Sequence, residues 1–391
     1  MKKRRIAVIV QRYGEEVSGG AELHARWLAE HLLALADVEV LTTCALDYTT
    51  WANYYPPGES CINGVPVHRY PVDWPRNWPQ SQKRTFELIS TRHSLLDELE
   101  WIKEQGPIST PLLNAISAAH DQYDTFLFFT YLYATTFFGL PLVSDKAILV
   151  PTAHDEPYLK LPLFRPTFNL PQVIIYNTET ERQMVNAVMH NHDPVQIVAG
   201  VGINVPEEAS GQRFRRQFGI EEPFVLYVGR VDRAKNIPEL LAYFARFKQD
   251  NSQPLKLVLI GRENIPLLKH PDILHLGFQP EQVKFDALAA AEVVIVPSLY
   301  ESLSMIALEA WWMEKPVMVN GRCEIMKQQC RHSNGGLYYQ VYDEFEVILM
   351  KLLADAELRR KLGRQGRHFV AHNYHWDVIM AKYKVVLETM F

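Results

Sequence analysis

Two basic side chains follow one of the predicted strands in the second half of the chain. Arg230 and Lys235 come shortly after the apolar run Phe224–Val228. Asn236 and Glu239 match a variant of the capping box, so we expect a helix to start at Asn236. A lysine at the positive end of a helix costs up to about 1 kcal/mol unless an anion is present, and an arginine can bind two phosphate oxygens at once. The segment therefore predicts an anion site, with a solvated basic loop as the alternative.

A second polar segment follows the apolar run Val293–Val296. Glu301 lies at the end of this loop, and the next predicted helix opens with Ser302, Leu303 and Ser304. The first N–H groups of a helix have no partner within the helix. This segment could therefore hold the same anion as the basic pair.

Glu309 interrupts an otherwise apolar helix, eight residues after Glu301. A buried carboxylate without a partner is costly, so something must satisfy it. The partner is either a structural one, with Arg230 or Lys235 as candidates, or a pair of hydroxyl groups on a ligand.

The first half of the chain carries two further candidates. Gly19 and Gly20, preceded by Ser18, come after the run Ile6–Val10 and before a predicted helix. Two glycines there let backbone N–H groups approach a diphosphate, although an ordinary strand-to-helix turn explains them equally well. His154 follows a later apolar run and could share a proton or bind a sugar, but a lone histidine is more often structural.

Residues 46–80 are rich in aromatic side chains and proline and show no helical periodicity. Packing of a long loop against its domain is one explanation. The other is that some rings stack on the sugar faces of an acceptor, and the residues singled out for this are Trp51, Tyr54 and Trp78.

A repeated alternation of short apolar runs with helical stretches must position these candidates. Continuous apolar strands between helices indicate parallel sheets covered on both faces, so we predict an α/β fold with two doubly wound units. In such sheets ligands bind outside the carboxyl ends of the strands. The predicted runs are 6–10, 38–42, 65–70, 125–130, 147–150, 173–176 and 195–198 in the first half, and 224–228, 255–260, 273–276, 293–296, 317–319 and 337–339 in the second.

A polar segment at 205–222, leading into a short basic helix, separates the two halves, so we place the boundary near residue 204, with domains at 1–204 and 205–375. Residues 125–143 form a stretch of 19 residues without a charge, close to the length of a membrane span. Threonines, a glycine and a proline within it favour a buried strand followed by a turn.

Together the motifs resemble those of retaining glycosyltransferases of family 4, over nearly the whole chain. The resemblance implies the GT-B fold, with two doubly wound Rossmann-like domains facing across a cleft and a C-terminal helix at about 376–391 crossing back to the first domain. It also implies transfer of a sugar from a nucleoside diphosphate sugar, bound mainly by the second domain, to an acceptor bound mainly by the first. The motifs that carry it are Gly19-Gly20, Gly229-Arg230 with Lys235-Asn236, and Glu301 with Glu309.

The resemblance also implies roles for individual residues. Arg230 and Lys235 neutralise the diphosphate, while Glu309 holds the ribose hydroxyls and Glu301 those of the donor sugar. The implied mechanism is substitution on the front face, in which positive charge stabilises the leaving group and the leaving phosphate oxygen accepts the proton of the acceptor. The implied donor-binding residues are Gly19, Gly20, Arg230, Lys235, Glu301, Ser302, Leu303, Ser304 and Glu309. The implied catalytic residues are Arg230, Lys235, Glu301 and His154.

One motif departs from the family pattern. Where the family usually has Phe-Gly after the first glutamate, this chain reads Glu301-Ser302-Leu303-Ser304. No Asp-X-Asp motif occurs, so we expect no metal and no cofactor besides the nucleotide sugar as co-substrate. On the resemblance alone, UDP-glucose is the expected donor, and a saccharide or lipid-linked molecule in polysaccharide or glycolipid biosynthesis is the expected acceptor.

Other classes of protein remain as alternatives. A sugar-nucleotide epimerase of the same fold is the closest rival. A nicotinamide dehydrogenase would need a G-x-G-x-x-G motif after its first strand, and a two-lobed sugar-binding protein would need an export signal; the sequence shows neither. With 40 basic and 45 acidic residues, a net charge of −5 argues against nucleic acid as a partner. Four cysteines without zinc spacing suit reduced thiols in a cytoplasmic protein, with contact at the inner membrane face and the oligomeric state left open.

Overall fold

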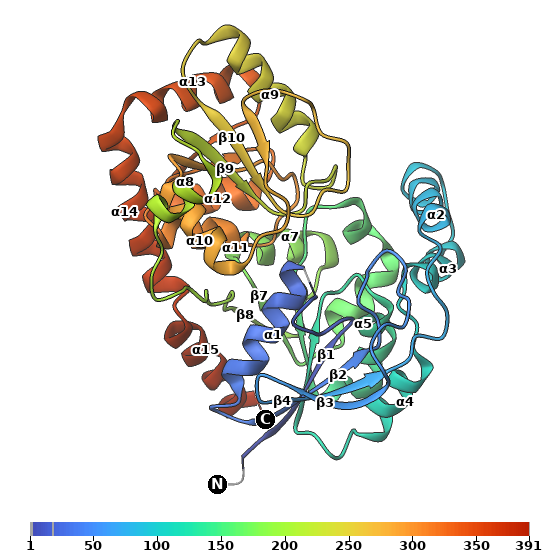
Figure 1. Cartoon of the computed structure of the whole chain (residues 1–391). Coiled ribbons are helices and arrows are strands. Elements are labelled where there is room, and N and C mark those ends of the chain that lie inside the picture. Colours follow the sequence, from blue (N-terminus) through green and yellow to red (C-terminus); the bar gives the residue numbers. More distant parts are fainter. Residues whose placement is uncertain (1–2, 18, 391) are drawn as a thin grey trace. The chain divides into compact units, whose positions relative to one another are not determined.

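The computed structural model describes residues 3–17 and 19–390. It separates into two compact units, residues 1–202 with 379–391 and residues 203–378. Each unit is a sheet covered by helices (Figure 1). Ser18, which precedes the glycine pair, lies outside the described residues.

The described part of the first unit holds eight strands and the helices between them. The strands are β1 (Arg5–Val10), β2 (Asp37–Thr43), β3 (Gly58–Ile62), β4 (Val65–Tyr70), β5 (Thr125–Phe129), β6 (Ala147–Val150), β7 (Val173–Tyr176) and β8 (Val195–Val198). The α-helices are α1 (Gly20–Leu32), α2 (Trp78–Ser90), α3 (Leu95–Gln105), α4 (Thr110–Ala118), α5 (Ala134–Gly139), α6 (Arg165–Asn169) and α7 (Glu179–Met189). Three short 3₁₀ helices are η1 (Leu140–Lys146), η2 (Pro157–Lys160) and η3 (Pro162–Phe164).

The second unit begins with the short basic helix expected after the polar segment. Its strands are β9 (Phe224–Val228), β10 (Lys256–Ile260), β11 (Ile273–His275), β12 (Val293–Val296), β13 (Val317–Asn320) and β14 (Gly336–Tyr339). Its helices are α8 (Gly211–Phe218), α9 (Ile237–Asp250), α10 (Glu281–Ala290), α11 (Met305–Trp312), α12 (Glu324–Ser333), α13 (Tyr342–Ala354) and α14 (Ala356–Asn373). Helix α15 (Trp376–Met390) starts in this unit and belongs to the first unit from Ile379 onward.

Both sheets have the strand order of doubly wound folds. In the described residues the first sheet runs β3-β4-β2-β1-β5-β6-β7-β8, and the second runs β11-β10-β9-β12-β13-β14. Every neighbouring pair is parallel except β3 and β4. The predicted α/β fold with two doubly wound units is therefore confirmed. Each sheet has one switch point, β1 with β5 in the first and β9 with β12 in the second, where chain connections leave in opposite directions.

Strand β3 was not predicted from the sequence. Residues 46–80 were treated as a loop apart from the run at 65–70, but β3 forms an antiparallel hairpin with β4. Asn63 and Gly64 make the turn with φ angles of 49° and 83°. An Asn-Gly pair suits such a turn because both positions need positive φ. Exposed residues dominate β3, so it lacks the apolar run by which the other strands were found.

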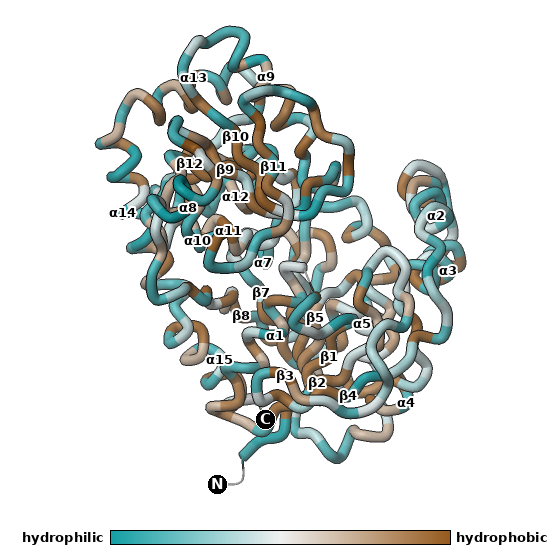
Figure 2. The backbone as a smooth tube through the Cα atoms, in the orientation of Figure 1, coloured by the Kyte–Doolittle hydropathy of each residue, from teal (hydrophilic) through white to brown (hydrophobic). Residues whose placement is uncertain are grey.

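The apolar strands make the two cores. Figure 2 shows the central strands of both sheets as hydrophobic, with mixed hydropathy along the helices around them. In the first unit the core includes Ile9, Phe126, Phe128, Leu149 and Ile174, and in the second Val225, Leu257, Leu259, Ile295 and Met318. Residues 125–143, whose length suggested a membrane span, fold into β5, α5 and the start of η1. Within the described residues, no helix is both long enough and apolar enough to cross a membrane.

Candidate active site

The switch point of the second sheet brings the two predicted polar segments together. Strand β9 lies directly beside β12, and the loops that leave their carboxyl ends meet. Lys235, from the loop after β9, places its Nζ 2.6 Å from Oε1 of Glu301, from the loop after β12. Two residues that the sequence separates by 66 positions thus form one ion pair at this edge of the sheet.

Arg230 also faces a carboxylate. Its Nε lies 3.5 Å from Oδ2 of Asp232, and the other oxygen of Asp232 accepts the backbone N–H of Lys235 at 2.9 Å. Asp232 therefore ties the two basic residues into one loop conformation. No role was predicted for Asp232 from the sequence, although an aspartate in a turn is a common acceptor for backbone N–H groups a few residues further along the chain.

The capping box predicted at Asn236 is wrong in its geometry. Helix α9 begins at Ile237, and the side chain of Asn236 caps none of its N–H groups. Asn236 instead adopts a left-handed backbone, with φ of 58°, and its Nδ2 donates to Oε1 of Glu239 at 2.8 Å and to the carbonyl of Pro297 at 3.2 Å. The side chain of Asn236 therefore links the loop after β9 to the loop after β12, where Pro297 lies, and does not cap the helix.

A glycine allows the neighbouring strand end to come close. A Cβ atom on Gly261, just after β10, would lie 1.8 Å from the carbonyl oxygen of Gly229. No side chain fits at that distance, so the close approach of these two loops requires glycine at Gly261.

The segment that opens α11 presents mainly backbone. Leu303 is buried, so its side chain is part of the core, and only its backbone is available to a ligand. Ser304 precedes the helix with φ of 69°, its hydroxyl does not cap α11, and its Oγ has no hydrogen-bond partner. A left-handed serine with an unsatisfied hydroxyl is strained, and such strain is common at functional sites.

Glu309 has a structural partner, but not one that we expected. Its Oε1 accepts from Nζ of Lys284 on α10 at 2.8 Å, and only 2% of the residue is exposed. The suggestion that Arg230 or Lys235 pairs with Glu309 is therefore wrong, because those cations are held by Asp232 and Glu301. Burial raises the pKa of the Glu309 carboxyl, and the positive charge of Lys284 opposes that rise.

In the first unit, the glycine pair lies beside a buried ion pair at the end of β1. A Cβ on Gly19 would lie 2.1 Å from Oε2 of Glu22, so a larger residue there would displace the Glu22 carboxylate, whereas Gly20 faces open space. Oε1 of Glu22 accepts from Nε of Arg12 at 3.0 Å and from Nε2 of Gln11 at 2.9 Å. Gln11 in turn accepts from the hydroxyl of Thr130, after β5, so this cluster marks the switch point of the first sheet.

His154 follows β6 in a loop that contacts two carboxylates, Glu156 and the buried Glu181. Its Nδ1 lies 3.6 Å from Oε1 of Glu156, which also accepts the hydroxyl of Tyr131 at 2.7 Å. The preceding residue, Ala153, donates its N–H to Glu181 at 2.6 Å. Burial raises the pKa of Glu181 to about 7, although the backbone N–H groups that donate to its carboxylate lower the pKa.

The three aromatic residues differ in exposure. Trp51 is 1% exposed and donates its indole N–H to the carbonyl of Gln105, so the suggestion that its ring stacks on a sugar is wrong. It packs in a small core cluster with Ala45 and Val72. Trp78, at the start of α2, is partly exposed, and Tyr54 is 63% exposed, so both rings can be reached.

The comparisons with known proteins decide the family of the second unit. Residues 210–369 match the family model described as "Glycosyl transferases group 1". This part of the chain is a group 1 glycosyltransferase domain. It contains Arg230, Asp232, Lys235, Lys284, Glu301 and Glu309, so the ion pairs described above for the second unit lie within the matched residues.

Whole-chain relatives agree with this glycosyltransferase assignment. An uncharacterized glycosyltransferase from Methanocaldococcus jannaschii is 25% identical over 427 aligned residues, covering 99% of each chain. A D-inositol 3-phosphate glycosyltransferase from Pseudarthrobacter chlorophenolicus is 25% identical, over 96% of this chain and 92% of its own.

Solved structures show that the whole chain has the GT-B fold, as the resemblance implied. Sucrose-phosphate synthase from Thermosynechococcus elongatus has a TM-score of 0.74 at 18% identity, covering 100% of this chain and 99% of that one. Anabaena HepE in complex with UDP-glucose has a TM-score of 0.71 at 14% identity, covering 98% of this chain and 100% of that one.

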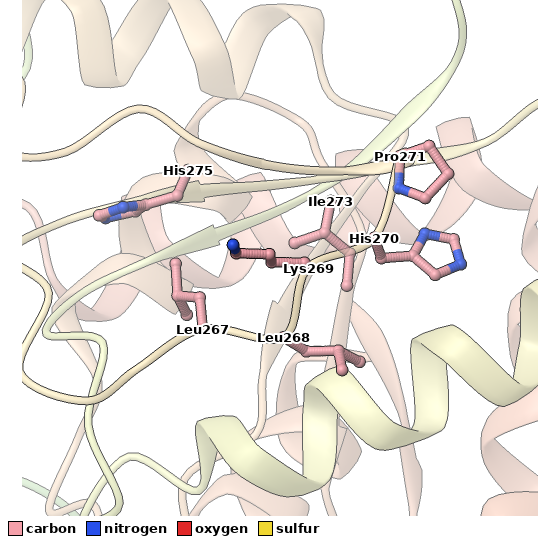
Figure 3. A pocket seen from close by; sticks show the side chains of 7 residues that line it. All are labelled: Leu267, Leu268, Lys269, His270, Pro271, Ile273 and His275. Atoms are coloured by element: carbon pink, nitrogen blue, oxygen red, sulfur yellow. The ribbon is translucent and has the colours of Figure 1, made fainter.

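The glycosyltransferase domain also contains a cavity that the sequence did not suggest. It measures about 480 Å³ and lies along the connection from β10 to β11 (Figure 3). His275, at the end of β11, donates from Nε2 to the carbonyl of Gly261 at 2.8 Å, which joins the cavity wall to the strand end beside Arg230. The lining residues are Leu267, Leu268, Lys269, His270, Pro271, Ile273 and His275. Across the described residues, no cluster of three or more histidine, cysteine, aspartate or glutamate side chains has the arrangement of a metal site.

Proposed function

We propose that this glycosyltransferase is a retaining enzyme that moves a hexosyl group from a nucleoside diphosphate sugar to a saccharide or lipid-linked acceptor. UDP-glucose is the expected donor. The observation that carries the proposal is the ion pair of Lys235 with Glu301, beside Arg230 and Asp232, at the switch point of a sheet in the group 1 domain. The solved complexes of HepE with UDP and with UDP-glucose support a nucleotide sugar as donor.

The paired charges suggest how the donor enters. A diphosphate carries more negative charge than one carboxylate, so it can draw Lys235 and Arg230 away from Glu301 and Asp232. Glu301 is then released to accept hydroxyl groups of the donor sugar. In the absence of donor, the same carboxylates hold the basic side chains at the site, so that their positions are already suited to binding the diphosphate.

The chemical step follows from the charges. A hydroxyl oxygen of the acceptor forms a bond to the anomeric carbon on the face from which the diphosphate leaves, and the bond from that carbon to the phosphate oxygen breaks. The proton of the acceptor hydroxyl passes to the departing phosphate oxygen. Arg230 and Lys235 stabilise the charge that builds on the diphosphate, so no enzymic nucleophile and no metal are needed in this proposal. His154 in the first unit is assigned to the reacting sugar, and Trp78 and Tyr54 to the acceptor.

A panel of donors tests the proposal. Thermal unfolding of the protein should be measured with UDP-, GDP- and ADP-sugars in EDTA, because a ligand at 100 times its Kd adds about 2.7 kcal/mol of stability. We expect one nucleotide class, UDP, to raise Tm, and UDP-glucose to do so among the UDP-sugars. No shift with any nucleotide sugar would contradict the proposal. The epimerase alternative is separated by radiolabelled donor, which would return an epimeric sugar nucleotide instead of a transferred sugar.

A further inference from the structure

Lys284 on α10 and Glu309 on α11 form an ion pair between two helices of the second unit. Lys284 is the third residue after Glu281 on α10, and its Nζ lies 2.7 Å from Oε2 of Glu281 and 2.8 Å from Oε1 of Glu309. Only 11% of the Lys284 side chain is exposed, whereas 67% of the Glu281 side chain is exposed. The lysine thus reaches inward past an exposed partner to meet a buried one.

The surroundings of Glu309 offer no other cation among the described residues. Strands β12 and β13, which pack against α11, carry apolar side chains and Asn320. On α14, which also packs against α11, Arg367 contacts the carbonyl of Trp312 and the carboxylate of Glu314, and no basic residue of α14 is among the charges that act on Glu309. Lys284 and Glu281 are therefore the charged groups that face Glu309.

Burial and the neighbouring charges act in opposite directions on the pKa of Lys284 and on that of Glu309. Burial alone would lower the pKa of Lys284, but Glu309 and Glu281 outweigh it and the net shift is upward, so Lys284 is positive at neutral pH. Burial acts the other way on Glu309 and favours the protonated carboxyl. Removing Lys284 would leave a buried carboxylate without a counter-charge, and such a group takes up a proton.

We propose that Lys284 is a positioning residue for donor binding, which keeps Glu309 ionised so that the carboxylate accepts the hydroxyl groups of the donor's ribose. The inference rests on the proposed function, because it takes Glu309 as the residue that binds the ribose. A protonated carboxyl would offer one acceptor less and lose the charge that strengthens both hydrogen bonds.

The test is calorimetric titration of UDP into Lys284→Met at pH 6 to 9. The ratio of its Kd to that of the wild type at each pH cancels the titration of UDP itself. We expect a ratio of about ten or more at pH 6, which falls toward one as pH rises, because Glu309 loses its proton again. The double variant Lys284→Met, Glu309→Gln should bind weakly with no such dependence on pH.

A matched control comes from the same unit. Lys248 is 12% exposed and pairs with Asp272 at 3.3 Å, so Lys248→Met removes a similar buried lysine away from the ligand. Its Kd ratio should stay near one at every pH. If Lys284→Met fails to fold, Lys284→Arg and Lys284→Gln are compared in the same way. We expect the Kd ratio to be independent of pH for the arginine variant and to depend on pH for the glutamine variant.

The outcomes separate this inference from the function on which it rests. A folded Lys284→Met protein whose Kd ratio is one, or is raised equally at all pH values, overturns the role of Lys284, provided that Glu309→Gln weakens UDP binding. A Glu309→Gln protein that binds UDP like the wild type removes Glu309 from the donor site and overturns both.

Discussion

Arg230 and Lys235 each form an ion pair with a carboxylate, and both side chains are partly exposed. A ligand can therefore reach both positive charges. We predict that Arg230→Ala and Lys235→Ala mainly lower kcat, by roughly 10² or more, because the charge they stabilise builds up only as the diphosphate leaves. Steady-state kinetics with one donor measures this. Arg246→Ala, which removes a surface pair with Asp250, is the matched control and should change little. If the Arg230→Ala and Lys235→Ala proteins fold and their kcat is unchanged, these residues do not belong to the active site.

Glu309 is assigned to a part of the donor that does not change during the reaction. Glu309→Gln should therefore raise the donor KM and leave kcat nearly unchanged. The measurement is the same set of kinetics, with circular dichroism to check folding. If the variant fails to fold, the pair with Lys284 is mainly structural, and if kcat falls as much as for Lys235→Ala, Glu309 acts on the reacting centre instead.

At the residue scale, the basic and acidic side chains predicted to bind the donor were found because they follow strands, whereas Asp232 in the same loop and Lys284 within a helix were missed. Arg230, Lys235 and Glu301 were found because each lies after an apolar run, and the topology of the sheet then brings two of them into contact. Lys284 could not be found in this way. It lies within a helix, three residues after Glu281, where a lysine usually forms a surface pair, and only the packing of α10 near α11 turns it inward.

At the scale of the elements, the loop that carries the aromatic residues divides into a buried and an accessible part. Trp51 fills a core cluster, so Trp51→Ala should destabilise the first unit by about 3 to 5 kcal/mol. Trp78→Ala should cost much less stability and raise the acceptor KM, because its ring is partly exposed. Urea denaturation followed by acceptor kinetics tests both. A Trp51→Ala protein of wild-type stability with a raised acceptor KM would reverse the assignment.

All thirteen predicted runs are strands, and most of them are continuous in apolar residues because parallel strands with both faces covered are buried. Strand β3 was missed for the opposite reason, since its side chains are exposed and only the Asn63-Gly64 turn marks it. Asn236 is the N-cap of α9 as the sequence predicts, but its side chain does not cap the helix, because a side-chain pattern does not reveal a left-handed backbone.

At the scale of the whole molecule, we predict that stability in acid depends on His24, a buried histidine of α1. His24 lies edge-on to Phe129, and burial lowers its pKa to about 3, from 6.5. The neutral ring favours the fold, so stability should fall as pH drops from about 6.5 toward 3, by about 1.4 kcal/mol for each pH unit. Glu181, with a pKa raised to about 7, acts in the other direction, and its contribution is lost as pH rises from 4.5 to 7.

His24→Leu should remove the acid-sensitive part and leave the contribution of Glu181. We expect the variant to be less destabilised than the wild type between pH 6 and pH 4, as measured by urea denaturation at each pH. Equal slopes for the two proteins would show that His24 does not control acid stability.

The central claim is transfer of a sugar with retention from a nucleoside diphosphate sugar without a metal. The most direct test is proton NMR of the reaction in EDTA, with the donor chosen by thermal shift and a mixture of sugars, sugar phosphates and polyols as acceptors. We predict that nucleoside diphosphate is released and that the new glycosidic bond has the same anomeric configuration as the donor. An inverted anomeric centre, an epimeric sugar nucleotide with no release of nucleoside diphosphate, or activity that returns only when magnesium or manganese is added would contradict the account.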